Sequence, residues 1–582
     1  MKNCSNMSLR TFKRLTENKE VILTDFFDTL VFRRIHSSQI YRQWAKALIH
    51  RLGLEEEIEV EEVVSSRHNA KTKLRRTYKE PPYAMVAGEI YDCFSKKARL
   101  SRTEFCNICL ETDKDVELGC QYGNTHLIKL LRSAKENGKK IYVVSDFYLP
   151  PETYRDFLIN AGCEDVVDGV FVSESCGKTK ANGSLYSYVL KELEAQPEQC
   201  VMIGDSKSSD VVMARKHGIA GVWYFPLRHK IWTNISRVLK LNYGDSIQAA
   251  LSSHLYKTSL FDEYAIVLYH FAHELVKTAS RDGAHNLAFV SRGGYFLKQV
   301  VDEYLHYAPR HNMSTAYCYA SRKVCLTVNA EEQKTLKEYL DGFKDGERLV
   351  MVDEGWYCHS QQRISELFKI PTTGYYLGVR GKDAGYENCT RKGLLFDKYG
   401  NEGKPSMYYG IFCTNCSMYE QMLTSNEGSV IGYTKENEKI APVLKVNQKE
   451  KSLYDEVISK WQRKMLLVIR GLCAWKLSDA LSERALAKMV LRTSLFASHW
   501  RCDLQNKLDS SMIDNFSQAK QRHKTAKDAH VNILDLIKRP DMYLGMVCKV
   551  QRIIHRHFLY NCLYKVFAFC FYWYVRFLKG LW

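Results

Sequence analysis

Short apolar segments alternate with amphipathic ones from about residue 119 to 245, and this alternation limits the fold more than any other feature of the chain. IYVVSDF, GVFVSES, CVMIGDS and AGVWYF have the length and composition of strands, and helical stretches of roughly 10–15 residues separate them. An earlier segment, VILTDFFDTLVF at residues 21–32, has the same character. Such alternation predicts an α/β fold, a Rossmann-like parallel sheet with helices on both faces.

Polar side chains follow the predicted strands, at the edge where a parallel sheet binds its ligands. Asp25, Ser145 and Asp205 each stand at the carboxyl end of one strand, and Lys178 and Lys180 lie in the loop between the last two. A carboxylate nucleophile, a hydroxyl, a lysine and a second carboxylate suit phosphoryl transfer through an aspartyl-phosphate. In such a site the carboxylates share a divalent metal, and the lysine and the hydroxyl bind phosphoryl oxygens.

The first segment also has a purely structural explanation. Asp28 and Thr29 follow its strand directly, and side chains of these types commonly cap the first turn of a helix. The segment alone does not distinguish a cap from a reactive loop. Several polar strand ends in one sheet favour a site.

The same segments resemble the first three motifs of the haloacid dehalogenase-like hydrolases. TDFFDTLV resembles the first motif, with Asp25 as the nucleophile and Thr29 as a substrate-binding threonine. IYVVSD is similar to the second motif, whose substrate-binding hydroxyl is Ser145. KANGSLY resembles the third motif and gives the catalytic and substrate-binding lysine role to Lys180, because Lys178 has the wrong spacing to the aromatic residue of that motif.

The fourth motif and a cap extend the resemblance. VMIGDSKSSD closely resembles the fourth motif, with Asp205 as a metal ligand and Asp210 supporting it. The resemblance implies a Mg²⁺ ion held by Asp25, Asp205 and the backbone carbonyl of Phe27. Residues 33–118, which have helical spacing of apolar residues, fall where this family places the helical cap that closes over the substrate.

Phe27 departs from the phosphatase pattern of the family. Phosphatases have a second aspartate at this position that protonates the leaving group, whereas dehalogenating members have an aromatic residue. The strong fourth motif favours the phosphatase, because a dehalogenase has no use for a metal. A lost general acid costs roughly 10²–10⁴ in rate. We therefore expect either a substrate with a good leaving group or a displaced acid/base at Asp28, for which helix capping is the other role.

The rest of the chain predicts further regions, because 582 residues exceed what one core can hold. A second alternation of strands and helices begins near residue 286, and helical patterns flank it. The expected regions are a hydrolase-like core at 20–32 and 119–245, the cap at 33–118, a helical connector at 246–285, a second α/β domain at 286–440, a helical region at 441–535 and a tail at 536–582.

The second half carries weaker signals. FVSRGGYFL, MVDEGWYCHSQQ and SNEGSVIGY are similar to segments that follow the hydrolase core in a branch associated with bacterial surface-polysaccharide synthesis. The turn at 291–294 could present backbone amides to an anion, and Asp353 and Glu354 follow a strand with Arg292 as a counter-charge. A structural turn, a helix cap and surface solvation explain these residues equally well, and His270, His273 and His359 are expected to be structural.

The cysteines indicate a reducing compartment. Nineteen of them are scattered without a framework, and the first 20 residues lack the apolar segment of a secretory signal, which predicts reduced thiols in a cytoplasm. Two pairs have CxxC spacing, at 106/109 and at 413/416, and a four-thiolate zinc site is the alternative to ordinary half-buried cysteines.

The last quarter of the chain is basic and ends in an aromatic segment. From residue 451 onward the chain has 23 Lys and Arg against 10 Asp and Glu, which indicates an anionic partner. No motif of a nucleic-acid-binding fold is present. The apolar core of the last segment, residues 566–575, would span about 15 Å as a helix against about 30 Å of hydrocarbon, so a membrane crossing is not expected.

A helix lying in the membrane interface is expected instead. At 100° per residue a polar stripe forms, which should face headgroups while Trp573, Phe577 and Trp582 enter the acyl chains. A helix packed on the protein or in a dimer is the alternative. The members of the stripe are Asn561, Lys565, Tyr572, Arg576 and Lys579.

Together these features predict a Mg²⁺-dependent phosphatase or phosphotransferase, peripheral on the inner face of the plasma membrane. Its substrate is expected to be a phosphorylated sugar or a nucleotide sugar used in surface-polysaccharide synthesis, with no nucleic-acid partner. The rival hypothesis is a binding or scaffold component in which the same site holds a phosphorylated glycan precursor without turning it over.

Overall fold

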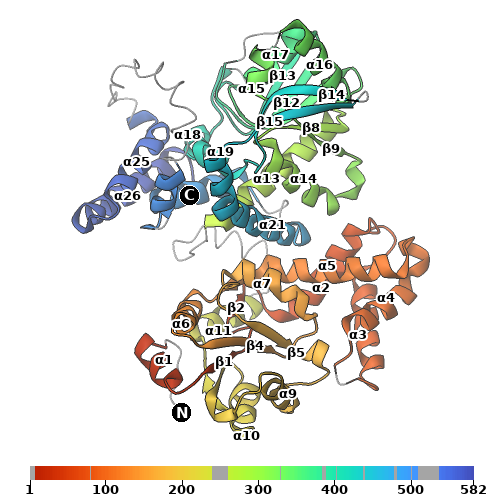
Figure 1. Cartoon of the computed structure of the whole chain (residues 1–582), viewed down its shortest axis with the longest axis vertical. Helices are drawn as coiled ribbons and strands as arrows, with labels where there is room; N and C mark the ends of the chain where they lie inside the picture. The colour runs from red at the N-terminus through yellow and green to blue at the C-terminus, as the bar shows by residue number, and fades with distance from the viewer. Residues whose placement is uncertain are drawn as a thin grey trace. The chain divides into compact units, whose positions relative to one another are not determined.

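The chain divides into two compact units, which are described separately. The N-terminal unit comprises Met1–Ile247, Tyr307–Pro309 and Arg470–Leu477, and the C-terminal unit comprises the remaining residues. Figure 1 shows the computed structural model coloured along the chain. The structure describes residues 7–78, 80–238, 260–327, 329–382, 388–400, 403–436, 439–476, 481–499, 501–508 and 537–581.

A five-stranded parallel sheet forms the centre of the N-terminal unit, as the alternation of strands and helices predicts. Its order is β5-β4-β1-β6-β7, with every neighbouring pair parallel. The chain leaves β1 toward β4 and returns on the other side at β6, so the topological switch point lies between β1 and β6. The strands are β1 (Val21–Thr24), β4 (Lys140–Ser145), β5 (Gly169–Val172), β6 (Cys200–Gly204) and β7 (Ala220–Trp223).

Helices cover this sheet and also form the predicted insert between β1 and β4. Apolar residues of β1, β4 and β6 join Leu185, Tyr186 and Val189 in one buried cluster. The helices of the core are α1 (Leu9–Thr16), α6 (Thr125–Glu136), α7 (Tyr154–Ala161), α8 (Ser173–Cys176), α9 (Ser184–Glu192), α10 (Ala214–Lys216) and α11 (Leu227–Val238), with the π-helical segment η4 (Lys207–Met213) and the short turns η2 (Pro151–Thr153) and η3 (Pro197–Gln199).

The insert itself is helical, and a short ribbon stands at its base. Strands β2 (Val31–Arg33) and β3 (Gln121–Gly123) pair antiparallel where the chain enters and leaves the insert. Ser101 and Glu104 form a capping box at the start of its longest helix, which satisfies orphan backbone donors. The helical elements are η1 (Ser37–Gln39), α2 (Ile40–Arg51), α3 (Val60–Leu74), α4 (Tyr83–Ala98) and α5 (Arg102–Cys120).

The C-terminal unit has a second parallel sheet, of order β13-β12-β11-β8-β9, with the short β10 (Lys344–Asp345) antiparallel to β11. Here the switch point lies between β8 and β11, because β9 and β11 flank the first strand on opposite sides. A separate hairpin pairs β14 (Ser429–Glu436) with β15 (Lys439–Lys445). The sheet strands are β8 (Asn286–Val290), β9 (Ser314–Cys318), β11 (Arg348–Trp356), β12 (Thr372–Val379) and β13 (Cys389–Asp397).

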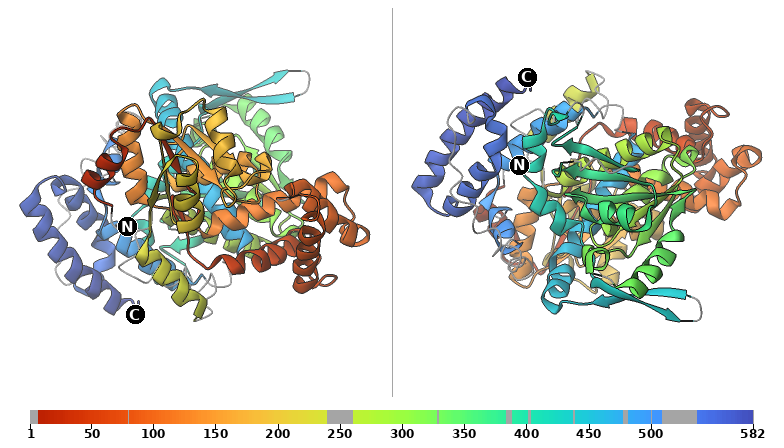
Figure 2. Two further views of the ribbon diagram at one scale, coloured as in Figure 1. Left: turned by 90° about the horizontal axis from the view of Figure 1, so that it is seen from below. Right: turned by 90° about the horizontal axis from the view of Figure 1, so that it is seen from above.

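Helices surround this sheet on both sides (Figure 2). Part of the predicted connector, residues 246–259, lies outside the described residues, as do residues 509–536 of the predicted helical region and tail. The helices are α13 (Leu260–Arg281), α14 (Gly294–His306), α15 (Arg322–Thr327), α16 (Ala330–Asp341), α17 (His359–Phe368), α18 (Tyr409–Cys413), α19 (Cys416–Met422), α20 (Gln448–Leu453), α21 (Ser459–Ala474), α22 (Glu483–Leu495), α25 (Leu544–Ile554) and α26 (Phe558–Leu578), with the turns η5 (Pro309–His311), η7 (Tyr454–Ile458) and η9 (Pro540–Tyr543).

The predicted orientation of the last helix, α26, is wrong. Asn561, Tyr572 and Arg576 of the predicted outward stripe are buried, and Lys579 contacts Asp541. These polar groups have partners within the unit, so the stripe faces the protein, and Lys565 alone of its members is exposed. Trp582 lies outside the described residues. Within the described ranges, each helix is too short or too polar to span a bilayer.

Candidate active site

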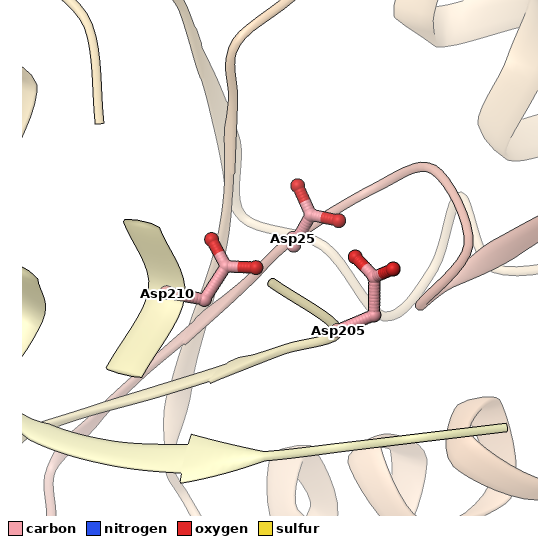
Figure 3. Close-up of side chains that lie close together, drawn as sticks. All are labelled: Asp25, Asp205 and Asp210. Atoms are coloured by element: carbon pink, nitrogen blue, oxygen red, sulfur yellow. The ribbon is translucent and has the colours of Figure 1, made fainter. Parts of the chain in front are cut away.

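Two carboxylates stand at the switch point of the first sheet. Asp25 follows β1 directly, Asp205 follows the neighbouring β6, and Asp210 comes from η4 one turn later. Figure 3 shows the three side chains gathered at this edge of the sheet. One oxygen from each lies within 4.8 Å of the others. The parallel sheet therefore brings together acids that are 180 residues apart in the sequence.

Lys180 reaches into this cluster from the loop before α9. Its buried Nζ donates to Asp25 Oδ1 at 2.6 Å and to Asp210 Oδ1 at 2.7 Å. The carboxylate of Asp146 holds the loop in place, because it accepts from the backbone N–H groups of Lys180 at 2.7 Å and of the next residue at 3.2 Å. Lys178 instead lies against the ring of Tyr188, so the structure brings Lys180, and not Lys178, to the nucleophile position.

Thr29 links the two strand ends. Its hydroxyl donates to Asp25 Oδ2 at 3.2 Å and accepts from the backbone N–H of Asp205 at 3.1 Å. Ser145, the last residue of β4, is buried at the end of the strand that neighbours β1. The capping explanation of the first segment is wrong, because the next described helix after it, η1, begins only at Ser37 and has His36 as its N-cap.

Asp210 is fixed by backbone contacts and by a close approach. Its Oδ2 accepts from the N–H of Ser206 at 2.9 Å, and the side chain is fully buried. A Cβ at Gly204 would lie 2.3 Å from that same oxygen, so only glycine leaves room for this carboxylate. Asp210 therefore anchors Lys180 and the turn after β6 at once.

Burial disfavours the ionised form of two acids in this group, Asp25 and Asp205. Desolvation raises the pKa of Asp25 to about 7, against the lowering influence of Lys180. Desolvation likewise raises the pKa of Asp205, while the neighbouring Lys230 lowers it. A divalent cation favours closely spaced, deprotonated oxygen ligands and offsets their mutual repulsion. The three carboxylates thus fit a Mg²⁺ ion.

Phe27 occupies the position at which the resembling phosphatases have a proton-donating aspartate. The ring of Phe27 lies 4.2 Å from the ring of Phe147, centroid to centroid. The guanidinium of Arg33 lies 3.8 Å from the centroid of the Phe27 ring. Two hydrogen bonds of 2.9 Å to Glu117 hold Arg33. Phe27 is therefore part of a packed aromatic and cationic stack, and its ring supplies no exchangeable proton.

Asp28 has other partners than a leaving group. The chain turns at this residue in the left-handed region (φ 58°), which aspartate tolerates better than most residues. Its Oδ1 accepts from His229 Nε2 at 3.1 Å, and its Oδ2 accepts from Lys230 Nζ at 2.6 Å. These two bonds and the ammonium charge hold the pKa of Asp28 well below its usual range, although burial opposes them. The carboxylate is thus an ionised counter-ion, and its acid role stays a prediction.

His229 and Lys230 are site residues that the sequence analysis missed. Both lie at the start of α11, directly after β7. Lys230 Nζ also lies 2.8 Å from Asp205 Oδ2, so it bridges Asp28 and Asp205. His229 stacks on Phe32 at 4.3 Å between centroids. The available signal was their position after another parallel strand, where polar residues join the same edge.

The zinc interpretation has no geometric support. Asp25, Asp205 and Asp210 form the one group of three or more potential metal ligands in the described parts of the chain. The sulfur atoms of Cys413 and Cys416 lie 3.9 Å apart. Cys413 is half-buried and Cys416 is buried, and both are free thiols. The predicted structural histidines behave as such where contacts are defined: His273 hydrogen-bonds the Tyr304 hydroxyl at 2.8 Å, and His359 stacks on Tyr357.

Comparison with known proteins bears on the N-terminal unit. Residues 19–218 match the model of the haloacid dehalogenase-like hydrolases. A sesquiterpene phosphatase from Aspergillus oryzae is 26% identical over 109 residues, which is 18% of this chain. The chain spans 52% of the length of that phosphatase. The match over residues 19–218 agrees with the predicted hydrolase family, and the resemblance to the surface-polysaccharide branch stays a prediction.

Solved structures similar to the chain include dehalogenases and a phosphatase. A 2-haloacid dehalogenase from Pseudomonas syringae pv. Tomato DC3000 is 15% identical, with coverage of 35% of this chain and 86% of that chain and a TM-score of 0.28. A predicted phosphoglycolate phosphatase from Haemophilus somnus 129PT is 17% identical, with coverage of 38% and 98% and a TM-score of 0.23.

Proposed function

We propose that the N-terminal unit is a Mg²⁺-dependent phosphatase or phosphotransferase that acts through an aspartyl-phosphate on Asp25. One observation carries the proposal: the Asp25 carboxylate is held between the ammonium of Lys180 and the hydroxyl of Thr29, beside the carboxylate of Asp205. A nucleophilic carboxylate needs this combination of orientation and neighbouring positive charge. The match of residues 19–218 to a hydrolase family supports it.

The metal would be held by Asp25, Asp205 and the backbone carbonyl of Phe27, with Asp210 in support. When bound, the ion supplies positive charge that offsets the repulsion between the carboxylates and an anionic substrate. The raised pKa of Asp25, about 7, indicates that the carboxylate is incompletely ionised at neutral pH without further positive charge.

The protein side chains account for the remaining roles. Asp25 attacks the phosphorus, the bond from phosphorus to the leaving oxygen breaks, and the leaving group departs with that bond's electron pair. Lys180 and Ser145 bind the phosphoryl oxygens, and Thr29 keeps the carboxylate in line. Water, or an acceptor hydroxyl in a transfer reaction, then attacks the phosphorus and gives its proton to solvent. The bond from phosphorus to the Asp25 oxygen breaks with its electron pair left on that oxygen, which restores the carboxylate.

The substrate proposal follows from the missing acid. Phe27 lies in its stack, so the leaving group should be stable as an anion or be protonated by solvent, as in a nucleotide sugar or an acyl phosphate. A phosphorylated sugar or nucleotide sugar also agrees with the resemblance of FVSRGGYFL and SNEGSVIGY to segments of the surface-polysaccharide branch. The phosphatase name of the Aspergillus oryzae relative supports phosphate ester chemistry in general.

A second candidate rests on the same two residues. Phe27 supplies no proton, and Asp28 is ionised and paired with His229 and Lys230. A site without an acid could hold a phosphorylated glycan precursor without turning it over. In that case the unit would be a binding component of a glycan assembly system.

Phosphate release from a panel of sugar phosphates, nucleotide sugars and an acyl phosphate tests the proposal. We expect Mg²⁺-dependent turnover by the wild-type chain, none by Asp25→Asn, and unchanged turnover by Asp165→Asn, an exposed aspartate paired with Arg132. Turnover that survives in Asp25→Asn would overturn the proposal. No turnover by the wild type, with phosphorylated ligands still bound in a calorimeter, would favour the binding component.

A further inference from the structure

The two last helices present a large apolar surface that the described chain leaves open. Helices α25 and α26 lie side by side in both views of Figure 2. Phe558 is 86% exposed, Ile553 71% and Val566 66%. We call this surface the α25–α26 face, and its further exposed apolar members are Met546, Val550, Leu559, Leu563, Phe567 and Phe569.

The opposite side of α26 is the one that packs on the C-terminal unit. Tyr564, Ala568, Phe571, Tyr572 and Val575 are buried there at helical spacing. The Tyr564 hydroxyl donates to the Leu495 carbonyl at 3.0 Å, which attaches the helix to α22. The exposed aromatic side chains are therefore not a misassigned core, because a second apolar side of the same helix already fills that place. A surface of this size usually marks an interaction site.

Basic side chains are interspersed with the exposed apolar ones. On α25, the exposed Lys549 is three residues after the exposed Met546 and four before the exposed Ile553, spacings that one helical face shares. Lys565 is exposed on α26, whereas Arg556, just after α25, is paired with Asp503 at 2.9 Å. Residues 537–581 contain eight Lys and Arg and one acid, Asp541, and that acid is buried against Lys579.

We propose that the α25–α26 face binds an anionic lipid surface, with both helices parallel to the membrane plane. Cations beside exposed aromatic and aliphatic side chains favour an interface that has acidic headgroups above acyl chains. A second copy of the chain fits less well, because it would oppose the same cations to one another. This inference concerns the C-terminal unit and does not depend on the proposed phosphatase.

The proposal reverses the orientation expected from the polar stripe. The stripe residues Asn561, Tyr572 and Arg576 point into the protein, while Phe558, Leu563, Val566 and similar side chains are free to enter the acyl region. Anionic lipids enrich the inner leaflet of plasma membranes, so the peripheral location expected from the sequence would follow from this face.

Flotation of the full chain with vesicles tests the proposal. We expect binding to vesicles of phosphatidylcholine with 30% phosphatidylglycerol on the order of tenfold tighter than to phosphatidylcholine alone, and weaker binding at high salt. Leu563→Glu should reduce partitioning of the chain onto anionic vesicles more than about tenfold. Lys565→Glu changes the charge by two units and should reduce that partitioning by about fivefold for each unit. Met85→Glu, at an exposed apolar position on α4, is the matched control and should have no effect.

Native cysteines provide a second readout on the unmodified chain. Cys562 and Cys570 are exposed on α26, and Cys93 is exposed on α4. Anionic vesicles should protect Cys562 and Cys570 from a water-soluble maleimide and leave Cys93 reactive. Since all three residues are measured in one sample by mass spectrometry, general aggregation would protect the exposed Cys93 as well.

Three outcomes would overturn the proposal. Equal binding to neutral and anionic vesicles would remove the role of the cations. Protection of Cys562 and Cys570 without lipid, together with a dimer in sedimentation, would assign the face to a second copy. Protection without lipid in a monomer would assign it to another segment of this chain.

Discussion

The two parallel sheets can be compared at their switch points, where each brings a pair of strand ends together. In the N-terminal unit the ends of β1 and β6 carry Asp25 and Asp205, and Lys180 reaches Asp25 at 2.6 Å. In the C-terminal unit Arg292 follows β8, and Asp353 and Glu354, which were expected to follow a strand, lie within the last four residues of β11. Both sheets therefore place charged groups where an open α/β sheet binds ligands.

At the second switch point the basic side chain bonds an acid from outside the sheet, whereas Lys180 at the first switch point bonds Asp25. Arg292 Nη1 bonds Glu450 at 2.5 Å, which takes the predicted counter-charge away from the acids. Burial and the neighbouring carboxylate of Glu354 raise the pKa of Asp353 well above its usual range. Among the described residues, the same architecture thus brings acids and a shared lysine together at the first switch point and pairs the arginine away from the acids at the second, which illustrates that side chains, and not topology, determine a site.

Replacement of one acid by asparagine at each switch point tests most directly whether the two sheets differ in function. Asp205→Asn should lower kcat/KM by about 10⁴-fold, since a metal contributes several kcal/mol to such a reaction, and should abolish Mg²⁺ binding in a calorimetric titration. Asp353→Asn should leave both quantities within about twofold, as expected for a group outside the reaction. Loss of turnover in a natively folded Asp353→Asn protein would place the active site in the second sheet.

Replacement of the lysine sharpens the comparison inside the first site. Lys180→Met should lower kcat by about 10³-fold, because it removes the charge beside the developing phosphoryl transition state. Lys178→Met, two residues away and against Tyr188, should leave kcat unchanged. Circular dichroism must accompany the kinetics, since Lys180 also neutralises the buried Asp210. Equal losses in both variants would contradict the assignment of Lys180.

The stability of the metal-free protein should depend on pH through Asp25. The pKa of Asp25 is about 7 in the folded state against 3.8 as its ordinary value, so between these values the folded state binds more protons than the unfolded state. The free energy of unfolding should therefore fall as pH rises from about 4 to 7, by up to about 4 kcal/mol from this group.

Asp25→Asn should remove that dependence and be the more stable protein above pH 7, when both are unfolded by urea in the presence of EDTA. Addition of Mg²⁺ should restore stability to the wild type and not to the variant. A wild type that is as stable at pH 8 as at pH 5 without metal would show that the acids are neutralised by some other means.

Substitution of Asp28 should have the smallest effect. Because Asp28 is ionised and bonded to His229 and Lys230, Asp28→Asn should change kcat by less than about tenfold for good and poor leaving groups alike. A general acid would behave differently, with a loss of roughly 10²–10⁴-fold confined to poor leaving groups. Comparison of an acyl phosphate with an alkyl phosphate distinguishes these cases.

The sequence predicts the first site well because the parallel sheet follows from local patterns. Once β1, β4 and β6 are recognised from their apolar runs, the carboxyl-end rule places Asp25, Ser145 and Asp205 at one edge without further information. For Lys230 the same rule indicates the sheet edge, because the residue follows β7, and it does not indicate that α11 brings the side chain to Asp28. Long-range pairings of this kind depend on how helices pack, which periodicity does not determine.

The last helix, α26, shows what sequence periodicity does not determine. Periodicity correctly groups Asn561, Tyr572 and Arg576 on one side of α26, and it does not indicate whether that side meets solvent or protein. Arg576 finds a carbonyl at Leu581 and an aromatic face at Trp573, so the polar side is satisfied internally. A stripe of polar residues on an aromatic helix is therefore insufficient to orient it.

The contacts around Asp25 also have a consequence for biosynthesis. Lys180 is 155 residues from Asp25 along the chain, and Lys230 is 202 residues from Asp28. Contacts of such long range form after the loops between them have closed. A ribosome that has released residue 200 has exposed Asp25 and Lys180 without the strand end that carries Asp205. The charged groups around Asp25 can therefore assemble completely only after residue 230 has emerged, because Lys230 bridges Asp28 and Asp205.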